Sequence, residues 1–124
     1  MDAHFSIEIE PERCLVHIIM GGFFNNEDVL SFRRELTERL YRLGCSPNDH
    51  VTLCDVSAMK IQTQDMVGVF SKIVGDSVFQ SRKLSFVTGS TLARMQTRRL
   101  TNREGVAYFT DVDEARTWLL QKGD

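Results

Sequence analysis

The chain has 124 residues, of which 42% are hydrophobic, and its formal net charge at pH 7 is −2. This length is typical of one domain, and the apolar fraction is ordinary for a globular protein. A pI near 5.9, with no aromatic residues interleaved among basic ones and no recognised binding motif, argues against a nucleic acid as partner.

Two strands open the chain. Phe5, Ile7 and Ile9 alternate with polar residues, and this period of two predicts a half-buried strand. A turn at Pro11–Arg13 leads to a second predicted strand, Cys14–Met20, which ends at two glycines. So short a connection favours an antiparallel hairpin.

A helix is predicted next. Asn25 can cap the free N–H groups at its start, the acidic residues that follow suit the helix dipole, and Gly44 is a typical stop. One residue of the preceding pair, Phe23 and Phe24, is expected to act as a hydrophobic staple. The other could be exposed and mark a partner or apolar-ligand surface. Apolar residues recur at helical spacing at Val29, Phe32, Leu36, Leu40 and Leu43.

Two strand–helix pairs follow. His50–Val56 and Arg82–Thr88 are the predicted strands. Thr63 is expected to cap the helix after the first strand, and Ser90 or Thr91 the helix after the second. The apolar residues of these helices are Met66, Val67, Phe70, Ile73, Val74 and Val78 in the first, and Leu92, Met95 and Leu100 in the second.

A last strand and helix complete the pattern. The strand is Gly105–Phe109, and Asp111 or Asp113 opens the helix that carries Ala115, Trp118 and Leu119. The order ββαβαβαβα predicts a single α/β domain over residues 1–124, with a mixed five-stranded sheet and four helices. Most of the sheet should be parallel, with one antiparallel edge strand.

One face of this sheet is expected to be thinly covered. Parallel strands wrapped by helices on both sides are normally apolar throughout. Here the alternate positions, taken together as one face, are Thr52, Cys54, Ser85 and Ala107. A thinly covered face would allow a homodimer.

The three cysteines, Cys14, Cys45 and Cys54, show no CxxC spacing. An odd count without a signal peptide predicts free thiols in a reducing compartment, which indicates a cytoplasmic protein. The start, Met1–His4, has no basic residues followed by an apolar run, which argues against secretion. The most apolar stretch, Cys14–Phe24, is too short to span a bilayer, so the chain is not expected to be transmembrane.

Three local motifs resemble the STAS/SpoIIAA-like family. They are Leu53–Ala58, a strand ending in an Asp-aliphatic-Ser step, then Lys83–Gly89, a strand and turn, and then Tyr108–Phe109 followed by Asp113–Leu119, similar to the "F…eAxxWL" ending of bacterial members. The order and spacing extend the resemblance over essentially the whole chain. Sec14-like lipid carriers share a similar order of helices and strands.

The resemblance implies a regulatory domain that binds another protein. In anti-sigma-factor antagonists of this family, a kinase phosphorylates a D-S-S/T-G motif in the loop before the second helix. The matching stretch here is Thr63–Met66, without the Ser-Ser-Gly, so a phosphorylation switch would have to use Thr63 or Ser57. Asp65 could act as a permanent negative charge.

The same loop is a candidate site on physical grounds. It follows the carboxyl end of a parallel strand and precedes a helix N-terminus, where ligands of open α/β sheets gather. Its candidate partner-binding residues are Asp55, Ser57, Thr63 and Asp65. The structural alternative is that Thr63 is a helix cap, Asp55 a turn residue and Asp65 a first-turn acid.

A basic segment is the second candidate site. Between Gln80 and Arg103 lie six cations and no acid. Arg94, Arg98, Arg99 and Arg103 could bind an anionic partner, ligand or membrane surface. The alternative is a solvated helix face.

Catalysis, a metal and a cofactor are not expected. His4, His17 and His50 lie on separate strands without the paired spacing of metal ligands. Cys54, in mid-strand, is expected to be a small core residue rather than a nucleophile. There is no G-x-S-x-G turn and no glycine-rich phosphate loop.

The sequence therefore favours one function and leaves a second as the alternative. The first is a non-catalytic, cytoplasmic bacterial domain that regulates a protein partner through the Asp55–Asp65 loop. The second is a domain that binds a small apolar ligand or lipid in a cavity between the sheet and the second helix. The residues expected to line that cavity are Met59, Met66, Phe70 and Met95.

Overall fold

A computed structural model describes residues 2–101 and 103–121 of the chain. Within these ranges the elements follow the predicted order, apart from a short 3-10 helix, η1 (Pro11–Arg13), between the first two strands. The strands are β1 (His4–Glu10), β2 (Leu15–Gly22), β3 (Val51–Met59), β4 (Lys83–Val87) and β5 (Val106–Phe109). The helices are α1 (Asn26–Leu43), α2 (Gln64–Gly75), α3 (Thr91–Arg98) and α4 (Val112–Leu119).

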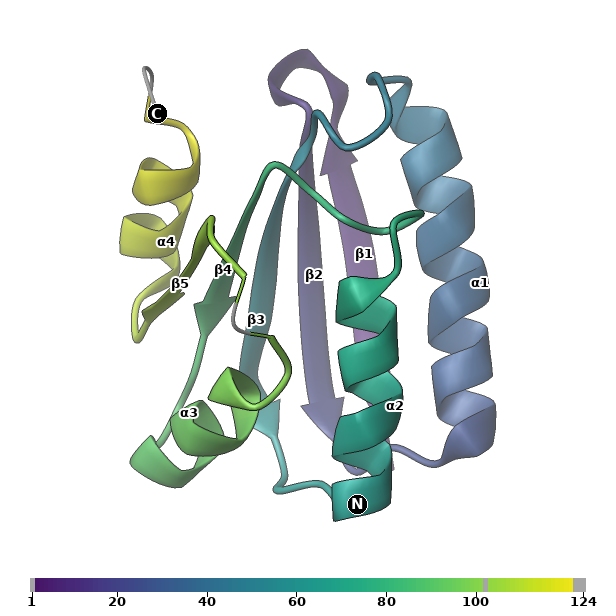
Figure 1. Cartoon of the computed structure of the whole chain (residues 1–124), viewed down its shortest axis with the longest axis vertical. Coiled ribbons are helices and arrows are strands. Elements are labelled where there is room, and N and C mark those ends of the chain that lie inside the picture. Colours follow the sequence, from purple (N-terminus) through teal and green to yellow (C-terminus); the bar gives the residue numbers. More distant parts are fainter. Residues whose placement is uncertain (1, 102, 122–124) are drawn as a thin grey trace.

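The strands form one mixed sheet in the order β1-β2-β3-β4-β5 (Figure 1). β1 pairs with β2 antiparallel, because the short η1 connection can only turn the chain back on itself. The pairs β2–β3, β3–β4 and β4–β5 are parallel, and a helix connects the two strands of each. The predicted α/β class, topology and antiparallel edge strand are confirmed.

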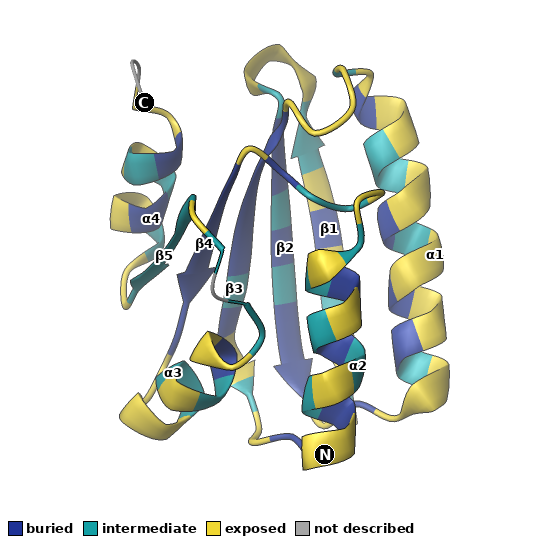
Figure 2. Ribbon diagram, in the orientation of Figure 1, coloured by how far each residue is buried: buried dark blue, intermediate teal, exposed yellow. Residues whose placement is uncertain are grey.

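The two faces of the sheet are covered unequally. Side chains of α1 and α2 pack on one face, over a core that includes Ile18, Cys54 and Phe86. On the other face α4 packs against β3, β4 and β5, around Leu53 and Leu119. Figure 2 shows the buried middle strands behind helices whose outer sides are exposed. On the second face β1 exposes His4, Ser6 and Glu8, so the expected thin cover is present.

The residues expected to share the thin face are in fact divided between the two faces. Cys54 pairs with Phe86, and both belong to the core under α1 and α2. Thr52 lies two residues before Cys54 in β3 and therefore on the same face of the sheet. Ser85 pairs with Leu53 instead, and it is buried on the α4 side with Ala107 as its neighbour on β5. The prediction was wrong because the register between strands decides which alternate residues share a face, and the sequence pattern of each strand does not specify that register.

Most helix ends lie where the sequence predicts them. Asn25 and Asp28 form a capping box at the start of α1, and Gly44 ends it in the left-handed region, with φ +74°. Ser90 caps α3 and Asp111 caps α4. Two apolar assignments were wrong. α2 ends at Gly75, so Val78 lies beyond it and is exposed. α3 ends at Arg98, so Leu100 lies beyond that helix.

A disulfide joins Cys14 to Cys45, and only Cys54 is a free thiol. The prediction of free thiols at all three positions was therefore wrong. Cys14 immediately precedes β2, and Cys45 follows the end of α1. Because α1 runs back along the sheet, its end lies near the start of β2. The two Cα atoms are 6.1 Å apart although 31 positions separate them. The inference of a reducing, cytoplasmic compartment loses its basis in the cysteines.

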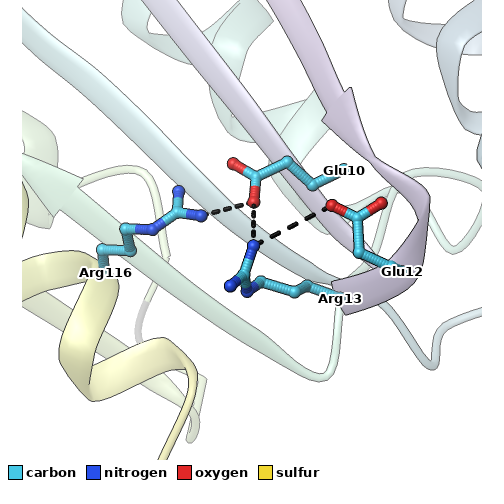
Figure 3. A network of polar contacts seen from close by, with 4 residues as sticks. All are labelled: Glu10, Glu12, Arg13 and Arg116. Carbon is cyan, nitrogen blue, oxygen red and sulfur yellow. Dashed lines mark hydrogen bonds and ion pairs between the residues drawn. The ribbon is translucent and has the colours of Figure 1, made fainter.

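An ion-pair network ties α4 to the edge of the sheet (Figure 3). The Glu10 carboxylate at the end of β1 accepts a hydrogen bond from Arg116 of α4 and another, at 3.2 Å, from Arg13. The Arg116 guanidinium is the largest cause that lowers the pKa of Glu10 below its ordinary value.

None of the helices among the described residues is both long and apolar enough to cross a membrane.

Candidate functional site

The predicted loop divides into a strand end and a short loop. β3 continues to Met59, so Asp55 and Ser57 belong to the strand rather than to a loop. Between the Ile19–Asp55 and Gly21–Ala58 pairs β3 carries one extra residue, a bulge. There the Asp55 carboxylate accepts hydrogen bonds from Ser57 N at 3.0 Å and Ser57 Oγ at 2.6 Å.

Thr63 and Asp65 lie on the far side of this loop, at the start of α2. Thr63 Oγ1 accepts a hydrogen bond from Met66 N at 3.1 Å, which is the helix cap expected from the sequence. Asp65 is exposed in the first turn. The contact of Thr63 matches the structural alternative of a helix cap, whereas Asp55 lies in β3 beside the bulge and not in a turn. Partner binding at Asp55, Ser57, Thr63 and Asp65, and phosphorylation at Thr63 or Ser57, stay predictions.

Gln62 holds the loop between β3 and α2 in place, a role that no pattern in the sequence indicates. Its side chain is 7% exposed and makes three hydrogen bonds: Nε2 donates to Gly22 O and Lys60 O, and Oε1 accepts from Phe24 N. Its backbone pairs with the Gln96 side chain of α3, at 2.8 Å and 2.9 Å. Gln62 therefore ties the β3–α2 loop to both the β2–α1 loop and α3.

Phe23 and Phe24, in that β2–α1 loop, separate as the staple predicts. Phe24 is 3% exposed and meets the Phe70 ring edge-on, with ring centroids 5.5 Å apart. Together with Val29, four positions beyond the Asn25 cap, it occupies the staple position of α1. Phe23 is 44% exposed.

A cavity of about 120 Å³ lies between the sheet, α2 and α3. The prediction of a cavity at this place is confirmed, but half of its expected lining was wrong. Met59 and Phe70 line it, whereas Met66 is buried in the core away from it and Met95 is 53% exposed on α3. Its walls are mainly aliphatic and aromatic side chains, among them Ile18, Met20, Val56, Val67, Ile73, Leu84, Phe86 and Leu100.

Polar groups make up a minor part of the surface of the cavity wall. Cys54 contributes a buried thiol, and burial raises its pKa to about 12, so the thiol is neutral and unreactive at pH 7. The other polar side chains that line the cavity are Thr52, Lys60, Gln62, Gln80, Ser81, Gln96, Thr97 and Arg103. Such an arrangement can hold an apolar group and orient it through a small number of polar contacts.

The cations of the basic segment do not form one surface. Lys83 is buried on the α4 face, where its Nζ donates to Trp118 O at 3.2 Å. On the opposite face the Arg98 guanidinium lies over the Tyr108 ring, 4.9 Å from its centroid. Arg99 is exposed, and Arg103 lines the cavity. Anion binding at Arg94, Arg98, Arg99 and Arg103 as a group stays a prediction.

The described part of the chain shows no cluster of side chains suited to a metal ion or to acid–base catalysis. His50 is buried, and burial lowers its pKa. Within residues 2–101 and 103–121, no three His, Cys, Asp or Glu side chains come together as a bound cation would need.

The arrangement of strands and helices matches that of a solved structure. The crystal structure of an uncharacterized protein of the DUF3478 family from Shewanella loihica PV-4, described as having a SpoIIAA-like fold, superimposes with a TM-score of 0.69. The match covers 94% of this chain and 93% of that one, at 18% sequence identity. The fold is SpoIIAA-like.

The SpoIIAA-like fold confirms the family resemblance at the level of structure. No family model and no curated protein matches the chain. An identity of 18% carries the fold and no activity, because a shared fold supports many functions.

Proposed function

We propose that this SpoIIAA-like domain binds a small apolar ligand in the cavity between the sheet, α2 and α3, without catalysis. The observation that carries the proposal is the cavity of about 120 Å³ with its mainly apolar wall. An engineered apolar cavity of about 150 Å³ binds benzene, so a space of this size suits a group of about six carbon atoms.

Energetics support an occupant. An apolar ligand in this space packs against the side chains of the cavity wall and gains dispersion contacts with them. The neutral Cys54 thiol on the wall supports a binding role in place of nucleophilic catalysis.

A cavity-filling substitution tests the proposal. Ala93 of α3 lines the cavity, so Ala93→Leu should fill it and abolish binding of 1-hexanol, followed by NMR shifts of the Ile18 and Leu84 methyl groups. The matched control is Thr91→Leu, which adds a similar side chain to an exposed position of the same helix and should leave binding unchanged. Equal hexanol binding by Ala93→Leu and the wild type would place the ligand elsewhere and refute the proposal.

A second candidate function is regulation of a protein partner at the Asp55–Asp65 surface. It is favoured by the exposure of Ser57, Thr63 and Asp65 around the carboxyl end of β3. Phosphate on Thr63 would lie at the positive end of α2, whereas on Ser57 it would lie beside the Asp55 carboxylate, so Thr63 is the better acceptor. A partner captured by wild type and lost with Asp55→Ala/Asp65→Ala would support this function, and equal capture would count against it.

A further inference from the structure

Arg103 lies in the wall of an apolar cavity and has no ion-pair partner among the described residues. Its side chain is partly buried and lines the cavity together with Phe79, Leu84 and Leu100. Nη1 donates to Glu104 O at 3.3 Å, a long contact with a neutral acceptor. Nε is fully buried and has no hydrogen-bond partner among the described residues. Burial of a guanidinium N–H without an acceptor is unfavourable.

No carboxylate of the described residues compensates this charge. The ion pairs found in residues 2–101 and 103–121 involve Arg13, Arg33, Arg39, Arg42 and Arg116, and none involves Arg103. The stretch from Gln80 to Arg103 contains no acid at all. Burial lowers the pKa of Arg103, but an arginine remains protonated at pH 7. A positive charge therefore persists at the edge of the cavity.

We propose that the ligand of this cavity is a short amphiphile with an anionic head, whose chain fills the cavity and whose carboxylate or phosphate binds Arg103. The inference rests on the proposed apolar-ligand function and specifies its ligand class. Nη1 is engaged by Glu104 O and Nε is buried, so Nη2 is the donor left to contact the head group. A guanidinium N–H forms a charge-assisted hydrogen bond with a carboxylate or phosphate oxygen.

Lys60 provides the comparison that isolates Arg103. It also lines the cavity, but its side chain is exposed, so water already solvates its charge. An exposed ion pair contributes little to binding, whereas a partly desolvated one contributes more. Removal of one positive charge at each position therefore changes the net charge equally and affects binding of the anion unequally.

The test compares hexanoate, hexyl phosphate and 1-hexanol by NMR titration of the wild type, Arg103→Gln and Lys60→Gln. We expect at least one anion to bind wild type about tenfold or more tightly than hexanol, because a charge-assisted hydrogen bond contributes that much. Arg103→Gln should remove this preference while hexanol binds as before, which also shows that the variant is folded. Lys60→Gln should keep the preference.

The outcomes separate the two proposals. Hexanol bound as tightly as both anions by the wild type would overturn the ligand class and leave the apolar-ligand function standing. An anion preference that survives in Arg103→Gln, or that disappears in Lys60→Gln, would also overturn the role of Arg103. No binding of any of the three compounds would refute the apolar-ligand function and this inference together. If only one anion is preferred, the head group is identified as carboxylate or as phosphate.

Discussion

Loss of the Cys14–Cys45 disulfide should destabilise the domain strongly. The bond closes a loop with a sequence separation of 31. The chain-entropy relation for a loop of this length gives a loss of about 3.7 kcal/mol in the free energy of unfolding at 25 °C. Small domains are stable by only about 5–15 kcal/mol, so reduction should remove a large share of the total.

Urea unfolding of the oxidised protein, the reduced protein and Cys14→Ser/Cys45→Ser measures this loss. We expect both perturbed forms to unfold at lower urea concentration, by a similar amount. Cys54→Val is the control, because Cys54 is outside the disulfide and a reductant should still destabilise this variant. Iodoacetamide in denaturant should label one thiol before reduction and three after it. Three thiols labelled without a reductant, or an unchanged urea midpoint on reduction, would refute the reasoning.

Three further predictions concern stability. Gln62→Leu should lower the free energy of unfolding by about 2–3 kcal/mol, because it leaves buried backbone groups unpaired. The control Gln64→Leu, at an exposed position, should change the free energy of unfolding little. Equal effects of the two variants in urea melts would contradict this prediction. Glu10→Gln should cost about 0.5 kcal/mol at pH 7 through lost pairing with Arg116. The pKa of Glu10 is lowered in the fold, so its contribution is complete above the ordinary value of 4.5 and is lost as the pH falls through the lowered pKa. In melts at a series of pH values, the difference between wild type and Glu10→Gln should therefore shrink as the pH falls below 4.5. The pKa of His50 is lowered in the fold, so as the pH falls the unfolded chain binds this proton first, and stability should fall below pH 6.5. His50→Phe should remove this component of the pH dependence. An unchanged slope of stability against pH in the variant would exclude a contribution from His50.

Local patterns in the sequence were sufficient for the elements and their caps. The alternation at Phe5–Ile9 and the apolar spacing after Asn25 depend on residues within one strand or a few helical turns. The caps at Thr63 and Asp111 depend on a hydroxyl or carboxylate three residues from its N–H donor. The strand–helix order then leaves few topologies, because parallel connections are short and right-handed.

The candidate site was only partly within reach of such patterns. A cavity under α2 was predicted, but Met95 was placed in its wall because apolar residues are expected to be buried, whereas α3 exposes it. Gln62 carries no local signal: its partners Gly22, Phe24 and Gln96 lie 34 to 40 positions away. In the sequence, Arg103 is one of six cations in the segment from Gln80 to Arg103, with nothing to distinguish it from the others. Its place in the cavity wall depends on how the chain returns from α3 to β5.

By itself, then, the sequence determined the α/β class, the order of the elements and most of their boundaries, because those depend on interactions between near neighbours in the chain. Only the tertiary structure decided that Cys14 bonds to Cys45, that Cys54 and Ser85 lie on opposite faces of the sheet, and that Arg103 meets the cavity. These features depend on strand register and on the path of the backbone between distant segments. No short pattern of residues encodes either one, since both are settled by the packing of the whole domain.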